Sequence, residues 1–308
     1  MATPRIRNPM LRAIYEHNTN ERFQRSCLHK FYDINKWYSC DLAKLPQWLS
    51  TQFVQCSLDQ GTELFLDQCY EKSGWFLTQA WHSVAKGFLT YVMSPTSANG
   101  LLRRGSMFVF SRDQFIRLLG VSETWRGNRV MDLGAGDGEV TKEMEAFFEE
   151  VYTTEVSWPM QWRLSGRGYK VLPTEEWSHV KSGHTYDVIG CLNLLDRCDR
   201  PLTLLADMRA SLSQSGVVIV AVVLPFKQYV ETGTHGNRPS EVIEVKGKHW
   251  EEQVQRLVEE VFHPAGYQVR SFSRVPYLCE GDATTPFYLL DDALFVLEAK
   301  QDAVAEDS

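Results

Sequence analysis

The chain has 308 residues, of which 44% are hydrophobic and 23% are charged. This balance is typical of a folded globular protein and excludes an intrinsically disordered chain. The formal net charge of −7 argues against the broad basic face that binds nucleic acids, so we expect no nucleic-acid partner.

The sequence also argues against a membrane span and a metal site. The longest apolar run, GVVIVAVVLPF at 216–226, is shorter than the roughly 18 residues that a span needs, so we expect no transmembrane segment. The seven cysteines form no CxxC pair, and the eight histidines form no cluster with ligand spacing. We therefore expect free thiols of a reducing compartment, an intracellular and cytoplasmic location, a monomeric chain and no metal ion.

Helical periodicity dominates the first part of the chain. Within 76–93 the apolar side chains recur every three to four residues, which predicts an amphipathic helix. Ser111 is placed to cap a helix that runs through Leu119. We predict that residues 1–120 form a helical extension that covers the following domain as a lid.

From residue 128 onward, short apolar runs alternate with helical patterns. Five apolar strands separated by helices indicate a parallel sheet covered on both faces, and two final strands are close enough in sequence to pair antiparallel. The predicted strands are Arg129–Leu133, Glu150–Glu155, Tyr169–Leu172, Tyr186–Leu192, Gly216–Leu224, Tyr267–Pro276 and Tyr288–Leu297. This layout predicts an α/β domain at 121–298 with the seven-stranded, Rossmann-like fold of class I S-adenosylmethionine methyltransferases, followed by an acidic, disordered tail at 299–308.

The motif DLGAGDG at 132–138 follows the first predicted strand and is typical of a nucleotide-binding loop. The dinucleotide pattern G-x-G-x-x-G would need a third glycine where Glu139 stands, and this carboxylate would repel a pyrophosphate at the start of the helix. The pattern D-x-G-x-G-x-G matches at each position, and its glycines let the backbone approach an amino-acid moiety closely. The motif therefore favours methyl transfer over hydride transfer.

These residues predict part of a cofactor site. Asp132, Gly134 and Gly136 are candidate contacts for S-adenosylmethionine in the loop. The second strand ends at Glu155, which is placed to accept both ribose hydroxyls of an adenosine, although an acid at this position also occurs in NAD-binding proteins.

Two further candidates lie outside this motif. Arg104, between the glycines of GLLRRGSMF, is a candidate partner for the cofactor carboxylate, and a surface arginine is the alternative. Tyr277, in VPYLCEGD, follows a predicted strand and is a candidate for the crevice, and a core aromatic position is the alternative. Neither residue belongs to a motif that decides between these interpretations.

The fourth predicted strand is followed by two candidate catalytic residues, Asn193 and Asp196, in NLLD. Side chains at the carboxyl ends of parallel strands face the ligand crevice of open α/β sheets. A carboxylate that accepts a hydrogen bond from one imidazole nitrogen leaves the lone pair free on the other, which suits a nitrogen nucleophile. The alternative is that Asp196 or Asp199 only caps the next helix.

Beyond these motifs, the chain resembles the DREV or methyltransferase-like nine family, whose members are protein-histidine methyltransferases. The resemblance runs from about Trp37 to Leu297. Its most specific blocks are the segments containing GSMFVFS and CLNLLDRCD. The matching segments are LDQGTELFL (58–66), EKSGW (71–75), NGLLRRGSMFVFSRDQF (99–115), DLGAGDGEVTK (132–142), CLNLLDRCDRPLTLL (191–205), PYLCEGD (276–282) and LDDALFVL (290–297).

The resemblance implies methylation of the pros (Nπ) nitrogen of histidine in His-x-His segments of protein substrates, with x a small residue. It further implies that Glu155, Asn193 and Tyr277 contact S-adenosylmethionine, and that Asp196 engages the target imidazole. It adds the endoplasmic reticulum and the mitochondrion as alternative compartments. Two other functions stay open at this point: methylation of a small molecule or RNA, and cofactor binding without turnover by a regulatory protein.

Overall fold

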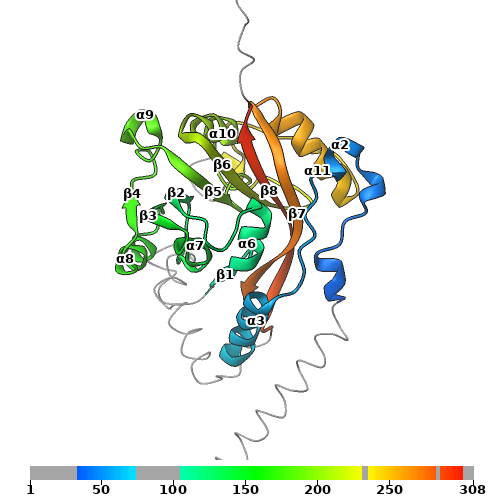
Figure 1. The fold of residues 1–308 in the computed structure, drawn as a ribbon, viewed down its shortest axis with the longest axis horizontal. Helices are drawn as coiled ribbons and strands as arrows, with labels where there is room; N and C mark the ends of the chain where they lie inside the picture. Colours follow the sequence, from blue (N-terminus) through cyan, green and yellow to red (C-terminus); the bar gives the residue numbers. More distant parts are fainter. Residues whose placement is uncertain (1–32, 74–104, 231–234, 282–284, 301–308) are drawn as a thin grey trace, which may run out of the picture.

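The apolar runs form one eight-stranded sheet with the strand order β1-β7-β8-β6-β5-β2-β3-β4 (Figure 1). The computed structural model describes residues 33–73, 105–230, 235–281 and 285–300. The parallel strands are β2 (Gly127–Leu133), β3 (Phe148–Thr154), β4 (Lys170–Leu172), β5 (Tyr186–Leu192) and β6 (Leu212–Val223). The antiparallel strands are β7 (Tyr267–Glu280), β8 (Phe287–Ala299) and β1 (Met107–Phe108).

The predicted five parallel strands and the terminal antiparallel pair are confirmed. The last strand, β8, lies between β6 and β7, so the hairpin joins the parallel part through the strand that comes last in the chain. The strand β8 continues through Ala299, and the backbone N–H of Lys300 donates to the carbonyl of Gly266 at 2.9 Å. The first two residues of the predicted disordered tail are therefore tied to the sheet, and 301–308 lie outside the described residues.

The eighth strand comes from the segment that the sequence indicated as helical. Met107 and Phe108 of β1 pair antiparallel with Cys279 and Leu278 of β7. A strand of two residues is too short to show an alternating pattern, which explains why the sequence did not indicate it. The amphipathic helix predicted at 76–93 lies outside the described residues.

Helices cover both faces of the sheet. Because successive side chains of a strand point to opposite faces, Met131 and Ile189 belong to one core layer and Val130 and Val188 to the other. The first layer packs against α2 (Gln47–Ser50), α10 (Pro201–Ala210), α11 (Trp250–Arg256) and the π-helix η4 (Leu257–Phe262). The second packs against the 3-10 helix η1 (Ile34–Trp37), α3 (Gln60–Ser73), α6 (Arg112–Leu119) and α7 (Glu139–Glu145).

The remaining helices among the described residues are the 3-10 helices η2 (Leu42–Lys44) and η3 (His235–Asn237) and the helices α8 (Trp158–Gly166) and α9 (His179–Ser182).

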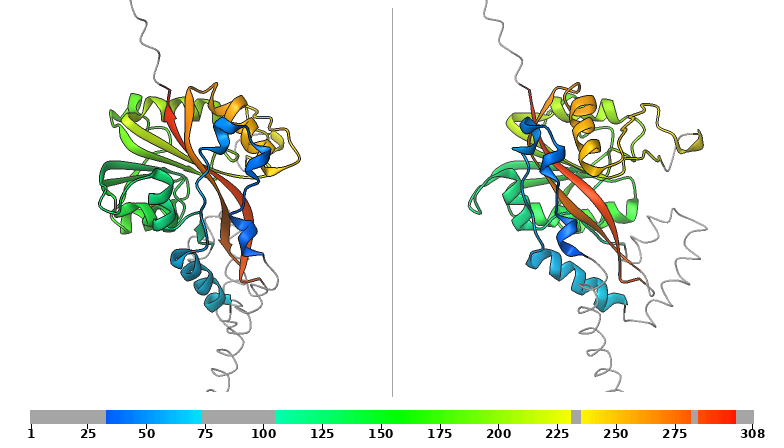
Figure 2. Two further views of the ribbon diagram at one scale, coloured as in Figure 1. Left: turned by 45° about the vertical axis from the view of Figure 1, so that its right-hand side comes forward. Right: turned by 90° about the vertical axis from the view of Figure 1, so that its right-hand side faces the viewer.

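The N-terminal segment contacts the antiparallel end of the sheet. Trp37 of η1 and Tyr70 of α3 both pack edge-on against Phe287 of β8. Figure 2 shows β7 and β8 extending past the parallel strands to the place where α3 lies.

The helix predicted after Ser111 is confirmed as α6. Ser111 Oγ accepts from the backbone N–H of Gln114 at 3.1 Å, and the Gln114 side chain accepts from the backbone N–H of Ser111 at 3.2 Å, which completes a capping box. The same hydroxyl donates to Asp59 just before α3. The helix ends at Gly120 in the left-handed conformation.

We expect Ser111→Ala to lower the free energy of unfolding by about 2 kcal/mol, since it removes both the cap and a hydrogen bond to a carboxylate. Urea denaturation followed by circular dichroism measures this change. Ser122→Ala, which removes an exposed hydroxyl, is the matched control. Equal free energies of unfolding for the two variants would show that the cap formed by Ser111 does not stabilise the folded protein.

Candidate active site

The carboxyl ends of three parallel strands bring the sequence motifs to one edge of the sheet. Leu133 at the end of β2 pairs with Thr154 of β3 on one side and with Cys191 of β5 on the other. The strands that follow β2 in the sequence thus lie on both of its sides, with β3 and β4 on one side and β5 and β6 on the other. Such a reversal of strand order opens the crevice in which α/β sheets bind ligands. The glycine loop, Glu155 and Asn193 follow these three strand ends.

The glycine loop has the conformation that its composition predicts. Gly136 and Gly138 have φ values of 57° and 78°, in the left-handed region that favours glycine. A Cβ on Gly138 would lie 2.8 Å from Leu164 Cδ2 of α8, whereas a Cβ on Gly136 would meet no atom within 4 Å. Gly138 therefore permits close packing, and the space beside the Gly136 Cα is open.

Glu155 connects the end of β3 to this loop. Its carboxylate accepts from the backbone N–H of Gly136 at 3.0 Å and from that of Ser157 at 2.8 Å. The residue is 7% exposed. Each carboxylate oxygen keeps a second lone pair, so the side chain still has the capacity to accept two hydroxyl donors.

Asp132 lies beneath the loop, and its side chain is only 2% exposed. Its Oδ2 accepts from the Thr141 hydroxyl of α7 at 2.6 Å, and its Oδ1 would lie 3.1 Å from a Cβ on Gly190 of β5. Burial raises the pKa of Asp132 to about 7, with the Thr141 hydrogen bond opposing and nearby Glu155 adding to the rise. In this structure Asp132 holds α7 to β2, and its contact with a cofactor stays a prediction.

Asn193 leaves β5 in an unusual backbone conformation, with φ of 54°. Its backbone N–H donates to the carbonyl of Ala221 on β6 at 2.9 Å, and its Nδ2 donates to Asp292 Oδ2 on β8 at 2.8 Å. The amide oxygen, Oδ1, is buried without a hydrogen-bond partner among the described residues. Buried polar atoms of this kind are rare in proteins, and they require an explanation.

Asp196 is 5% exposed, and its Oδ1 is likewise buried without a partner in the described part of the chain. Its Oδ2 accepts from Arg197 Nε at 3.3 Å. Burial raises the pKa of Asp196, and the Arg197 guanidinium opposes that rise.

The alternative that Asp196 or Asp199 caps α10 is wrong. The N-cap of α10 is Arg200, which has no side-chain cap bond. Asp199 instead accepts from the backbone N–H of Ser240 at 2.7 Å and from its hydroxyl.

Asp292 is a member of this site that the sequence interpretation missed. The residue is 0% exposed, and its Oδ1 has no partner among the described residues. Burial raises its pKa well above the ordinary value, the nearby carboxylates of Asp196 and Asp291 add to the rise, and the Asn193 hydrogen bond opposes it. A signal was present in LDDALFVL, because one of two adjacent aspartates in a buried strand must point to a covered face.

We call Asn193, Asp196 and Asp292 the acceptor cluster. Tyr277 of β7 lies beside it: Asp292 and Arg197 both influence its pKa, which burial raises well above the ordinary value. The tyrosine hydroxyl donates to Met107 Sδ of β1. The structure therefore brings three of the predicted site residues together. The remaining candidate, Arg104, lies outside the described residues.

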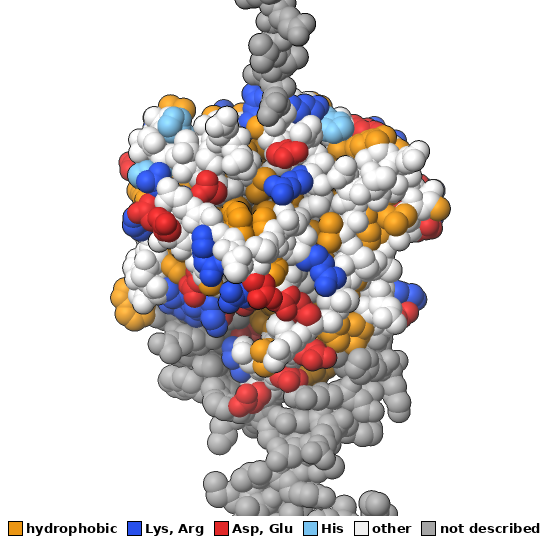
Figure 3. All heavy atoms as spheres, in the orientation of Figure 1, with side chains coloured by type: hydrophobic (Ala, Val, Ile, Leu, Met, Phe, Trp, Pro, Cys, Tyr) orange, Lys and Arg blue, Asp and Glu red, His pale blue; other side chains and the backbone are white. Residues whose placement is uncertain are grey.

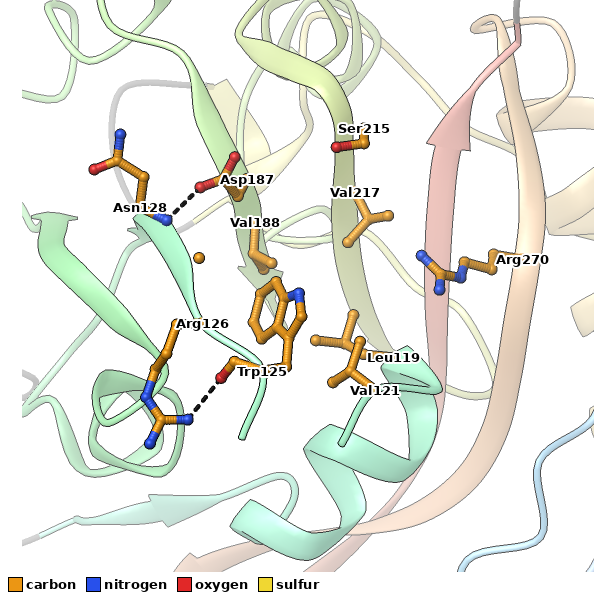
Figure 4. Close-up of a pocket in the computed structure, with 11 residues that line it drawn as sticks. Leu119, Val121, Trp125, Arg126, Asn128, Asp187, Val188, Ser215, Val217 and Arg270 are labelled. Atoms are coloured by element: carbon orange, nitrogen blue, oxygen red, sulfur yellow. Dashed lines mark hydrogen bonds between the residues drawn. The ribbon is translucent and has the colours of Figure 1, made fainter. Parts of the chain in front are cut away.

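A separate hollow lies at the opposite edge of the sheet (Figure 4). It is lined by Trp125, Arg126 and Asn128 near the start of β2, with Arg270 of β7 across from them. Asp187 is the acid in this hollow, but it accepts from the backbone N–H of Asn128 at 2.6 Å and from the Ser213 hydroxyl at 2.8 Å. Because these are the amino ends of the parallel strands and this carboxylate is satisfied, the hollow is a poor candidate for the active site.

The described surface carries mixed charges. Figure 3 shows Lys and Arg side chains interspersed with Asp and Glu on this face of the molecule. Within the described residues, no helix is long and apolar enough to cross a membrane. The same residues contain no group of three or more His, Cys, Asp or Glu side chains that is arranged to hold a metal ion.

Known proteins resemble this chain at two levels. Residues 37–299 match the family model described as DREV methyltransferase. Similar solved structures include a proposed RNA methyltransferase of Pyrococcus horikoshii, at 14% identity and a TM-score of 0.41, covering 67% of this chain and 84% of that one. Another is the ribosomal protein L11 methylase of Lactobacillus delbrueckii subsp. bulgaricus, at 14% identity and a TM-score of 0.37. That match covers 63% of this chain and 82% of the other. A third is an S-adenosylmethionine-dependent methyltransferase of Clostridium acetobutylicum, at 13% identity and a TM-score of 0.38. That match covers 56% of this chain and 85% of the other.

The raised pKa of Asp132 predicts a pH-dependent difference in stability between the protein and Asp132→Asn. The folded state holds the Asp132 proton more tightly than the unfolded state, whose pKa is near 3.8. This contribution to stability is therefore complete below pH 3.8 and is lost as the pH rises through about 7. From pH 4 to pH 7.5 we expect the native protein to lose up to a few kcal/mol relative to the variant.

Urea unfolding at a series of pH values measures this difference. Thr141→Val removes the hydrogen bond that lowers the pKa of Asp132, so it should move the loss to higher pH. Parallel pH curves for the native protein and Asp132→Asn would contradict the expectation.

Proposed function

Because this chain belongs to the DREV methyltransferase family, we propose that it methylates a histidine side chain of a protein substrate. The chain is an S-adenosylmethionine-dependent methyltransferase with a Rossmann-like α/β fold. The observation that carries the histidine proposal is Asp196, a buried carboxylate with one unpartnered oxygen at the carboxyl end of β5.

The residues at this edge of the sheet fit S-adenosylmethionine. The space beside the Gly136 Cα is open, Glu155 keeps lone pairs for the ribose hydroxyls, and Asn193 Oδ1 lacks a donor among the described residues. With Gly134, Asp132 and Tyr277, these residues would hold the cofactor, and Arg104 would pair with its carboxylate. The cofactor supplies a methyl group that is already activated on a sulfonium.

The work left to the protein is to orient the nucleophile. Asp196 Oδ1 accepts a hydrogen bond from one N–H of the target imidazole, which places the lone pair on the other nitrogen. A bond from that nitrogen to the methyl carbon would form as the methyl–sulfur bond breaks, leaving the sulfur as a neutral thioether. The ring would become cationic, and the Asp196 carboxylate would stabilise its charge. Asp196 then accepts the N–H proton and releases it to solvent, which leaves a neutral methylated ring.

Burial of Asp196 supports this role. Because desolvation raises the pKa of its carboxyl group, the carboxylate is a stronger proton acceptor than an exposed aspartate. Methylation at the pros nitrogen, and a preference for His-x-His segments with a small middle residue, follow from the family resemblance and are part of the same proposal.

The proposal is tested by incubating the protein with S-adenosylmethionine carrying a labelled methyl group and a peptide that contains His-Ala-His. We expect one labelled methyl group on a histidine ring, located by mass spectrometry of fragments, and none on a matched Ala-Ala-Ala peptide. A structured RNA and a lysine-rich peptide serve as competing substrates. Label on lysine or on the RNA, or no label on any substrate, would overturn the histidine assignment.

We expect Asp196→Asn to reduce the rate of methyl transfer about 100-fold or more, since it removes a positioned acid–base group. Cofactor affinity, measured by calorimetry, should change little. Asp199→Asn is the matched control, because Asp199 binds Ser240 at the surface. A parallel loss of cofactor affinity and rate in Asp196→Asn would assign Asp196 a structural role.

A further inference from the structure

The acceptor cluster contains more hydrogen-bond acceptors than the described residues satisfy. One oxygen of each member is buried without a partner: Asn193 Oδ1, Asp196 Oδ1 and Asp292 Oδ1. Asp292 is the most buried of them and is 0% exposed. A buried carboxylate oxygen without a donor costs free energy, so the arrangement is explained best by a ligand that brings donors.

The single hydrogen bond inside the cluster sets its orientation. Asn193 Nδ2 donates to Asp292 Oδ2 at 2.8 Å, so the amide oxygen of Asn193 must point away from that carboxylate oxygen. Asn193 is also held by its backbone N–H, which donates to Ala221 on the neighbouring strand. Asp292 therefore determines which end of the Asn193 amide remains available to a ligand.

The charged groups around Asp292 favour a cationic ligand. Asp196 places negative charge near it, and Asn193 adds a neutral acceptor, whereas the charge of the adjacent Asp291 is offset by a cation. Asp291 is paired with Arg274 on the neighbouring strand. A second cation among the described residues, Arg197, bonds to Asp196, and its side chain is 46% exposed.

S-adenosylmethionine carries a group of the required kind in the α-ammonium of its amino-acid moiety, which has three N–H donors and a positive charge. An imidazole N–H offers one donor, which Asp196 accepts in the proposed reaction. Among the ligands of this enzyme, the ammonium is thus the group that satisfies two acceptors at once.

We propose that Asp292 is a cofactor-binding residue whose unpartnered Oδ1, together with Asn193 Oδ1, receives the α-ammonium of S-adenosylmethionine. This inference concerns the cofactor and does not depend on the histidine substrate. It assigns a role in binding to a residue on β8, which lies outside the glycine loop and outside the NLLD segment.

The proposal is tested by calorimetric titration of Asp292→Asn with four ligands in the absence of a peptide. S-adenosylmethionine and S-adenosylhomocysteine carry the ammonium, as does decarboxylated S-adenosylmethionine, whereas 5′-methylthioadenosine lacks it. We expect ligands that carry the ammonium to bind at least about tenfold more weakly, the effect of losing one charge-assisted hydrogen bond.

Binding of 5′-methylthioadenosine should change less than about twofold, and this ligand therefore also reports that the variant is folded. Asp291→Asn is the matched control, since Asp291 is the adjacent aspartate and pairs with Arg274. It should bind all four ligands as the native protein does. Equal weakening of all four ligands by Asp292→Asn, or weakening of none, would overturn the proposal.

Discussion

The parallel pairing of β2 with β3 and with β5 is the constraint on which the site depends. Its register aligns Leu133 with Thr154 and Cys191, so the three segments that follow these strands begin side by side. The glycine loop, Glu155 and Asn193 are separated in sequence by up to about 60 residues, yet they reach one edge because parallel strands all end on the same side. A shift of one residue in either register would turn their side chains to the opposite face.

Burying several carboxyl groups at this edge of the sheet costs free energy in the protein without a ligand. Asp132, Asp196 and Asp292 are carboxyl groups with raised pKa values, and burial is the largest cause for each of them. Two of them leave an oxygen without a partner among the described residues. Buried carboxyl groups of this kind indicate a site for a ligand that brings hydrogen-bond donors and positive charge, and S-adenosylmethionine carries both.

Much of the fold was predictable because its signals are local. The strand at Tyr186–Leu192, the capped helix after Ser111 and the glycine loop each depend on residues that are close in sequence. Asp292 was not predicted, because its hydrogen-bond partner, Asn193, lies 99 positions away and the contact depends on β8 lying beside β6. The strand β1 was missed for a related reason, since its two residues form a strand only by pairing with β7.

The central place of β8 has a consequence for biosynthesis. This strand pairs with β6 on one side and β7 on the other, although it follows both of them in the sequence. Until residues 287–299 are made, the parallel strands and β7 have no common neighbour, and the carboxylate of Asp292 is missing from the site. The growing chain therefore holds an unpaired apolar edge at β6 until residues 287–299 are synthesised, and such an edge tends to pair with other chains.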